Sequence, residues 1–243
     1  MLKIISHITK AIILIVASVL CFSCGSDFRS VSGDGNVTTQ TRPVNSGFDA
    51  VSASGGLEVI IEQGSQSIVT VEADGNLQEH IITEVNGNEL KIYTDMNIRN
   101  ASKKKVTIVL PNITRISAAS GSEVINKGTL KSESLTLDSS SGSNLKANIQ
   151  VRNVKLETSS GSSLEVVGIS KTIEAHASSG SSLDAEKLKT GDAEAHASSG
   201  GSVTINPSTS LTADASSGGS VVYIKAPAKI SKKASSGGSV SLK

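Results

Sequence analysis

A short serine–glycine motif repeats through the second half of the chain and constrains the fold more than any other feature. Successive copies are spaced by 21, 19, 19, 20, 18 and 19 residues, counted between their glycines. A period near twenty residues is typical of solenoid proteins, whereas repeats built from helix pairs need about 33 residues or more. The seven turn glycines are Gly121, Gly142, Gly161, Gly180, Gly200, Gly218 and Gly237.

Apolar residues occupy every second position on both sides of each motif. Val154 and Leu156 precede the third copy, and Leu164 and Val166 follow it. This alternation indicates half-buried β-strands. Each repeat is therefore predicted to contain a strand, a Ser-Ser-Gly bend, a second strand and a variable polar return such as residues 186–192.

Stacking of these repeats predicts an all-β fold, a right-handed parallel β-helix or β-solenoid with rungs of 19–20 residues. Neighbouring rungs would pair at about 4.8 Å. Glycine permits a tight bend in every rung, and the small serine side chains can hydrogen-bond within the bend or to the next rung. The repetition is thus explained by architecture before any function is considered.

The sequence divides into four segments. Residues 113–243 hold the regular repeats, while residues 46–112 form a β-rich N-terminal part of the same solenoid domain, with longer strands and a divergent turn at residues 54–56. Asn86-Gly87, between two alternating apolar runs, predicts a hairpin there. Residues 24–45 are rich in Ser, Gly, Thr and Asn and are predicted to be a flexible tether.

Residues 1–23 have the features of a secretion signal. Two lysines accompany an apolar run over residues 11–22, which is shorter than the ~20 residues that a membrane-spanning helix needs. The sequence Ser23-Cys24-Gly25-Ser26 resembles the end of a bacterial lipoprotein signal, which implies cleavage before Cys24 and acylation of that residue. An ordinary secretory signal cleaved nearby is the alternative. Because both cysteines lie before residue 25, the mature chain is expected to have no internal disulfide.

His176 and His196 are the strongest candidates for a metal site. They occupy equivalent outward positions of adjacent repeats, and Glu174 and Glu194 form a second pair two residues earlier. Two imidazoles and two carboxylates suit a transition metal such as zinc. The alternative, which we favour, is a pair of exposed repeat copies, because the flanking repeats offer Glu157 and Asp214 but no third histidine. No metal and no cofactor are predicted.

Other chemistries are poorly supported. The outward acids Glu157, Glu174, Glu194 and Asp214 are expected to form one thin file without repeating basic partners, whereas a polysaccharide-cleaving β-helix needs clustered carboxylates. Aromatic residues, which serve as sugar-binding platforms, make up only 2% of the chain. A net charge of +1 does not favour nucleic acid. The sequence therefore predicts no enzyme and no catalytic residue.

Three stretches resemble a known family: SGFDAVSASGGLEVIIEQG, SIVTVEADGNLQEHIITEVNGNELKIYT and VTIVLPNITRISAASGSEV. They are similar to the bacterial DUF2807 family, labelled a putative auto-transporter adhesin, head GIN domain, and the leader is similar to those of Bacteroidetes lipoproteins. The resemblance implies a β-helical protein of the cell envelope and brings no catalytic residues.

We therefore expect a non-enzymatic, lipid-anchored outer-membrane protein on the cell surface or the periplasmic face, with an adhesion or scaffolding role. The alternative is a carbohydrate-binding or polysaccharide-degrading β-helix. Expected partners are the membrane, through the N-terminal lipid, and a glycan or envelope protein. The open end of the last rung is expected either to be protected by residues 225–233 or to form a homo-oligomer.

Overall fold

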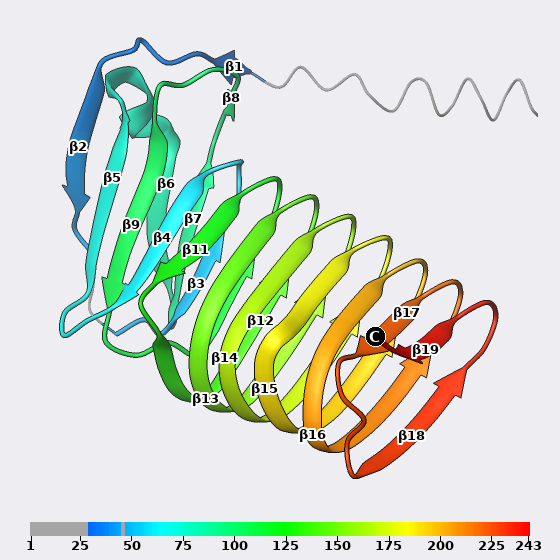
Figure 1. The fold of residues 1–243 in the computed structure, drawn as a ribbon. Helices are drawn as coiled ribbons and strands as arrows, with labels where there is room; N and C mark the ends of the chain where they lie inside the picture. Colours follow the sequence, from blue (N-terminus) through cyan, green and yellow to red (C-terminus); the bar gives the residue numbers. More distant parts are fainter. Residues whose placement is uncertain (1–28, 45–46) are drawn as a thin grey trace, which may run out of the picture. The chain divides into compact units, whose positions relative to one another are not determined.

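The chain is described here by a computed structural model, which defines residues 29–44 and 47–243. Residues Val31–Lys243 form one compact unit made almost entirely of β-strands stacked in a coil (Figure 1). The predicted right-handed all-β solenoid is confirmed. The leader and Cys24 lie outside the described residues. Within the described ranges, no helix is long and apolar enough to cross a membrane.

The regular coil is built from parallel strands that pair in register. The first rung pairs with two earlier strands, β3 (Ala50–Ala53) and β4 (Glu58–Gln63), so residues 54–56 are indeed a divergent turn copy. The strands of the repeats are β10 (Arg115–Ala118), β11 (Glu123–Lys127), β12 (Leu130–Ser139), β13 (Asn144–Thr158), β14 (Ser163–Ala177), β15 (Ser182–Ala197), β16 (Ser202–Ala215), β17 (Ser220–Tyr223), β18 (Lys229–Ala234) and β19 (Ser239–Leu242).

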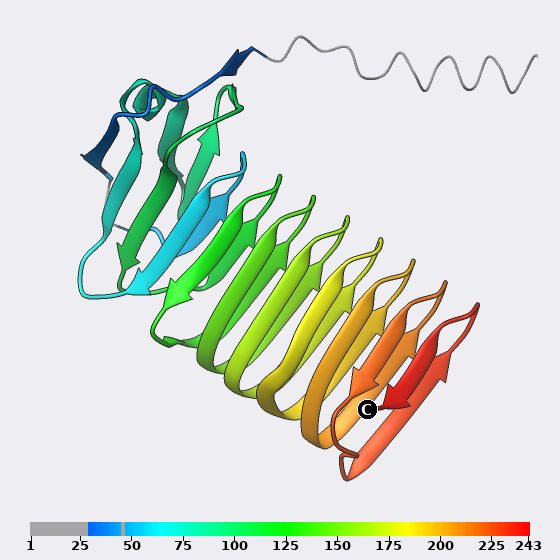
Figure 2. The ribbon, with the colours of Figure 1, turned by 45° about the horizontal axis from the view of Figure 1, so that its top comes forward.

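Each of the strands β13 to β16 runs from one Ser-Gly turn to the next and bends once on the way (Figure 2). The coil therefore has two long edges. We call them the turn edge, which holds the seven Ser-Gly turns, and the opposite edge, which holds the mid-strand bends. Between the edges, inward side chains of consecutive rungs stack into one apolar core, in which Phe48 and Tyr223 are the buried aromatic residues of the described ranges.

The Ser-Gly turns share one backbone geometry. In the turn at residues 178–181, Ser179 and Gly180 both have positive φ, at 53° and 68°, and the amide of Ser181 donates to the carbonyl of Ser178. Two successive positive φ values define a type I′ turn. In addition, the Gly180 amide donates to the Ser199 carbonyl of the next rung at 3.1 Å. All seven turn glycines share this conformation, since each has φ between 68° and 76°.

The residue that closes each turn changes from serine to glycine along the coil. Ser143, Ser162 and Ser181 are buried, and their hydroxyls hydrogen-bond inside the coil, for example Ser162 to the Ser139 carbonyl at 2.6 Å. In the later rungs the position is glycine, because a Cβ on Gly201 would lie 2.5 Å from the Ala177 carbonyl oxygen. The later rungs therefore approach too closely for any side chain at this position.

Strands in mainly antiparallel pairing, here called the N-terminal layer, extend both faces of the coil at its N-terminal end. The layer contains β2 (Val37–Arg42), β5 (Ile68–Asp74), β6 (Ile81–Asn86), β7 (Glu89–Thr94), β9 (Lys104–Leu110) and the 3-10 helix η1 (Gly75–His80), while β1 (Ser30–Val31) pairs with β8 (Asn97–Ile98). The predicted hairpin at Asn86-Gly87 is confirmed by the β6–β7 pairing. The predicted tether over 24–45 is wrong for Val37–Arg42, which pairs along its whole length with β5.

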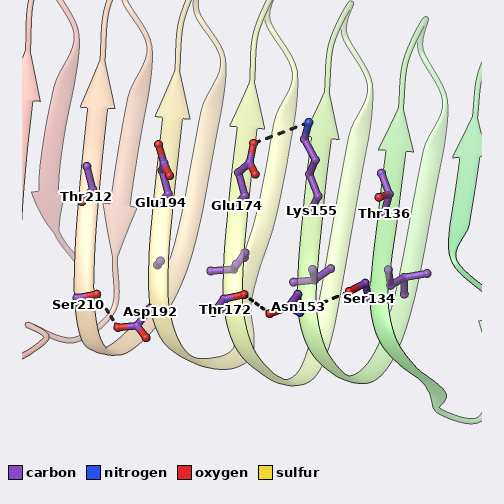
Figure 3. Close-up of a pocket in the computed structure, with 14 residues that line it drawn as sticks. Ser134, Thr136, Asn153, Lys155, Thr172, Glu174, Asp192, Glu194, Ser210 and Thr212 are labelled. Carbon is purple, nitrogen blue, oxygen red and sulfur yellow. Dashed lines mark hydrogen bonds and ion pairs between the residues drawn. The ribbon is translucent and has the colours of Figure 1, made fainter.

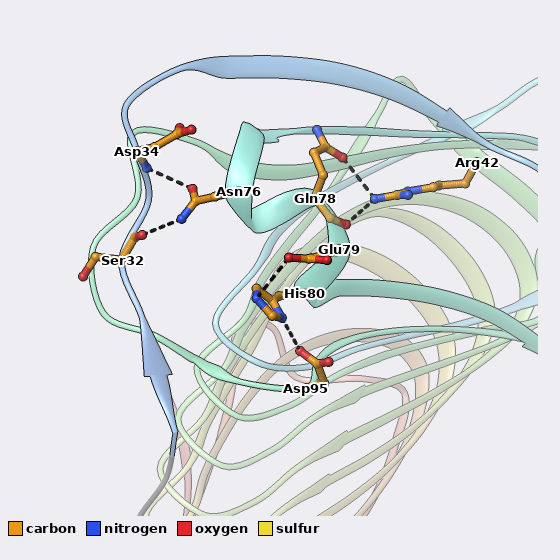
Figure 4. A network of polar contacts seen from close by, with 8 residues as sticks. All are labelled: Ser32, Asp34, Arg42, Asn76, Gln78, Glu79, His80 and Asp95. Carbon is orange, nitrogen blue, oxygen red and sulfur yellow. Dashed lines mark hydrogen bonds and ion pairs between the residues drawn. The ribbon is translucent and has the colours of Figure 1, made fainter.

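Polar contacts fix η1 within this layer (Figure 4). Arg42 donates to the carbonyl and the side-chain oxygen of Gln78, at 2.5 and 3.0 Å, and the buried Gln78 amide donates to the Thr38 carbonyl. Asn76 bridges the amide of Asp34 and the carbonyl of Ser32. These hydrogen bonds attach residues 32–42, whose composition is typical of loops, to the solenoid.

Asp74 is the most heavily bonded carboxylate of the described chain. It is buried, and it accepts hydrogen bonds from the backbone amides of Gly35, Ser102 and Lys103 at 2.9–3.1 Å. Burial favours the neutral form, but these backbone donors outweigh it and hold the pKa of Asp74 below its ordinary value. One side chain thus joins the loops that precede β2 and β9.

Candidate binding face

The strands that lead into the turns present a continuous polar face, which we call the pre-turn face. Its outward side chains stand in files, because consecutive rungs pair residue by residue. One file near the opposite edge contains Ser134, Asn153, Thr172, Asp192 and Ser210. A middle file contains Arg115, Thr136, Lys155, Glu174, Glu194 and Thr212, and a third contains Ser117, Asp138, Glu157, His176, His196 and Asp214.

A shallow hollow of about 420 Å³ lies over the first two files (Figure 3). A second hollow of about 760 Å³ adjoins it, reaches the β6–β7 hairpin and is also lined by Ser134 and Thr136. The two hollows therefore form one open groove, which runs along the coil from the hairpin to Thr212. Its lining is mainly hydroxyl, amide and charged groups.

The file near the opposite edge is cross-linked from rung to rung. Thr172 donates to the side-chain oxygen of Asn153 at 2.9 Å, and the Asn153 amide donates to Ser134 at 3.4 Å (Figure 3). Ser210 donates to the Asp192 carboxylate at 2.6 Å. These contacts hold the polar groups of the groove in place before any ligand arrives, which lowers the entropy cost of binding.

The charged side chains of the face compensate one another. Lys155 lies between two acids, 2.9 Å from Glu157 and 3.8 Å from Glu174. Arg115 lies 2.5 Å from Asp138. The expectation of one file of acids without basic partners is therefore wrong: the acids stand in two files, and Lys155 and Arg115 are interleaved with them. The offset from the turn glycines sets this arrangement, because Glu157 and His176 precede their turn glycines by four residues and Glu174 precedes its own by six.

Asp138 and Glu157 form a carboxyl pair on adjacent rungs. Burial and the hydrogen-bonded neighbour Glu157 raise the pKa of Asp138, and Arg115 and Ser117 offset this only in part. The hydrogen bond from Lys155 lowers the pKa of Glu157. One oxygen of Asp138, Oδ1, is buried without a hydrogen-bond partner among the described residues. If Asp138 is protonated, its hydroxyl can donate a hydrogen bond to the Glu157 carboxylate, which would give both carboxyl groups a hydrogen-bond partner.

His176 and His196 lie together as predicted. Their rings stack with centroids 4.8 Å apart and planes inclined by 6°. Each Nε2 atom faces the glutamate two residues earlier, with His176 2.8 Å from Glu174 and His196 2.9 Å from Glu194. The structure thus brings the four proposed metal ligands together as two side-by-side His–Glu pairs. In the described part of the chain, no group of three or more such side chains has the arrangement of a metal site.

Sequence reasoning missed the contribution of the hairpin to the groove. Asn86, Asn88, Glu89 and Lys91 line the second hollow, although they lie about fifty residues before the rungs that line the first. The parallel pairing of β3 with both β7 and β10 brings the hairpin beside the repeats. No periodic signal marks that pairing, but the divergent turn at residues 54–56 was a clue to it.

Comparison with known families agrees with this architecture. Residues 47–227 match the DUF2807 family, described as a putative auto-transporter adhesin, head GIN domain. The chain belongs to this family. The description of DUF2807 supports a role in adhesion and a location at the cell envelope or surface. No curated protein matched the chain.

Solved structures show the same fold at low sequence identity. A putative adhesin from Bacteroides fragilis has a TM-score of 0.81 and 19% identity, and a putative adhesin from Parabacteroides distasonis has 0.73 and 19%. A putative lipid binding protein from Parabacteroides distasonis has 0.71 and 18%. Each comparison covers 88% of this chain and 100% of the other. At such identities the likeness extends to the fold of this DUF2807 member and not to its ligands.

Proposed function

We propose that this protein is a non-enzymatic adhesin or scaffold of the cell envelope, held at the outer membrane by a lipid on Cys24, which binds its partner along the groove of the pre-turn face. The observation that carries the proposal is the continuity of the groove, whose polar side chains repeat from rung to rung. A surface of this kind suits an extended partner that runs along the coil axis.

The pairing of the charged groups favours binding over catalysis. Lys155 forms ion pairs with Glu157 and Glu174, and Arg115 forms one with Asp138. Each histidine lies within hydrogen-bonding distance of the glutamate two residues before it. Pairing of this kind neutralises much of the charge on the face and holds its polar groups in place for hydrogen bonding to a partner.

The first experiment tests location and anchoring. Protease treatment of intact cells is expected to digest the protein, because an adhesin must face outward, and Cys24→Ser is expected to release the protein from the membrane fraction. Protection until lysis would remove the adhesion role and favour a periplasmic scaffold. Membrane retention of the Cys24→Ser variant would contradict the lipid anchor.

A second candidate is a carbohydrate-binding or polysaccharide-degrading module. The hydroxyl and amide groups of Ser134, Asn153 and Thr172 favour it, because such groups commonly fix sugar hydroxyls. A glycan panel with product analysis separates the candidates. Glycan binding that is lost in Asn153→Ala would identify the groove as a glycan site. Polysaccharide cleavage that is lost in Glu157→Gln would contradict the proposal of a non-enzymatic function.

Self-association through the last rung is a further proposal. Strands β18 and β19 pair with β16 and β17, respectively, and Lys229, Lys232 and Lys233 are exposed on β18. Lysines on an outer strand commonly oppose edge-to-edge pairing. Sedimentation at high protein concentration tests whether the lysines keep the coils apart, and dimers that appear when the three lysines are replaced by threonine would support that role.

A further inference from the structure

The opposite edge carries an excess of positive charge. Six exposed basic residues lie on or beside its bends, and we call them the basic edge: Lys131, Arg152, Lys171, Lys187, Lys189 and Lys225. The acids on the same segments form ion pairs, Glu133 with Arg152 at 3.5 Å and Glu186 with Lys243 at 2.6 Å. Among the described residues, the five lysines have no carboxylate within 4.0 Å. The turn edge, by contrast, consists of uncharged serine and glycine.

An exposed isoleucine interrupts this edge. Ile169 pairs with Gln150 on one side and Lys189 on the other, and 57% of its surface is exposed, the highest value for a large hydrophobic side chain in the described ranges. It lines a hollow of about 480 Å³ together with Lys189, Lys225 and Ala226. One exposed apolar residue and two lysines therefore border the same hollow.

The backbone fixes Ile169 in this outward position. Gly168, directly before it, has φ of 124°, and a Cβ there would lie 1.9 Å from the Ile149 carbonyl oxygen. The pairing register with β15 shifts here, because the three steps from Glu165 to Gly168 face four steps from Asp184 to Leu188, so the partner strand β15 bulges beside Ile169. The exposure of Ile169 is thus built into the rung and does not arise from a mobile loop.

We propose that the basic edge binds the surface of an anionic phospholipid bilayer, with Ile169 inserted among the head groups. Basic side chains stand on the four successive rungs of β12 to β15, at steps of about 4.8 Å, so several reach a flat anionic surface at once. A soluble polyanion would use the lysines alone, whereas a bilayer also uses the isoleucine. The inference rests on the proposed function only in that an anchored chain stays close to a membrane, where one lipid chain and a basic patch together give stable binding.

The test uses unlipidated Val31–Lys243, because this compact unit contains the whole described core. Flotation is measured with vesicles of equal parts phosphatidylglycerol and phosphatidylcholine, and with phosphatidylcholine alone. Binding to the anionic vesicles only is expected, and it should fall as salt screens the charges. The quadruple variant K171Q/K187Q/K189Q/K225Q should bind on the order of a hundredfold more weakly, and Ile169→Ser about tenfold more weakly.

A matched variant removes the same charge elsewhere, K91Q/K103Q/K104Q/K146Q, and should bind the anionic vesicles several times better than the edge variant. Equal loss in the two quadruple variants would overturn the proposal, and so would equal binding to neutral vesicles.

Polygalacturonate, a soluble acidic polysaccharide, is the competing partner. Tight binding to it that depends on the edge lysines but not on Ile169 would assign the edge to polysaccharide. Circular dichroism of each variant verifies folding, and because Cys24 is absent, failure here leaves the anchoring experiment unaffected.

Discussion

Seven serines in the turns adopt a backbone conformation that residues with side chains seldom tolerate. Their φ values lie between 48° and 53°, in the left-handed region. Each is followed by a glycine, and in the first six turns the amide of that glycine donates to the carbonyl of the corresponding serine in the next rung, a ladder that offsets the local strain. Serine suits the position because its side chain is short and its hydroxyl can bond locally.

Glycines at two different positions of the Ser-Gly turns are predicted to differ in their tolerance of substitution. Gly180→Ala should lower the free energy of unfolding by about 1 kcal/mol, because the positive φ is strained although no atom lies within 4 Å of the added Cβ. Gly201→Ala should cost more, about 1–3 kcal/mol, because its Cβ would meet the Ala177 carbonyl oxygen at 2.5 Å. Chemical denaturation measures both, and a larger loss for Gly180→Ala would contradict the packing argument.

The two acids of the carboxyl pair are predicted to respond in opposite directions. A raised folded-state pKa means that the ionised form of Asp138 is disfavoured in the folded chain, so stability falls as pH rises past the ordinary pKa of aspartate. Asp138→Asn should therefore stabilise the protein near neutral pH, by up to about 1 kcal/mol, and remove that fall. Melting curves between acid and neutral pH measure both effects.

Glu157→Gln is the control for this pair. Lys155 stabilises the ionised glutamate and lowers its pKa, so the contribution of Glu157 is present at neutral pH and is lost as pH falls through the lowered value. The substitution should destabilise the protein at neutral pH by less than about 1 kcal/mol, since the pair is partly exposed. Stabilisation by Glu157→Gln, or destabilisation by Asp138→Asn, would show that the proton resides on the other member.

At the scale of elements, one carboxylate is predicted to govern the N-terminal layer. Asp74→Asn places an amide among three backbone donors, so the loops before β2 and β9 should open while the repeats stay folded. Because the pKa of Asp74 is lowered, the same opening should occur in the unmodified protein only when the pH falls below the ordinary pKa of aspartate. Hydrogen exchange localises the change, and uniform loss of protection along the coil would contradict it.

The elements that sequence predicts are those fixed by local pattern. Local spacing predicts the turn glycines, the alternating strands, the hairpin at Asn86-Gly87 and the juxtaposition of His176 with His196. The turn glycine fixes the register of its rung, because side chains alternate between the two faces of the strand on either side of it. Strand β2 was missed, since its threonine-rich sequence gains order only by pairing with β5. The groove was missed because part of its lining comes from the β6–β7 hairpin, and no periodic pattern links that hairpin to the repeats.

At the scale of the whole molecule, the fold is expected to tolerate the loss of one complete rung. Deletion of residues 159–177 joins Thr158 to Ser178, so a strand still leads into an intact Ser-Gly turn. Since each rung contacts only its neighbours, the variant should fold cooperatively with a smaller denaturant m-value, in proportion to the buried surface removed. Deletion of residues 159–176, one residue fewer, is the control, because it turns every second side chain of the joined strand to the wrong face. Equal stability of the two deletions would contradict a register-dependent core.

The direction of the ladder hydrogen bonds gives the coil different mechanical strengths along and across its axis. The bonds between rungs point along the axis, whereas the strands run across it. A pull along the axis loads the rung interfaces in series, so the weakest interface opens first and the coil lengthens one rung at a time. A pull across the axis shears all the bonds of a strand together, as many as fourteen residue pairs between β13 and β14. The coil is therefore expected to yield at a lower force when it is pulled along its axis than when it is pulled across it.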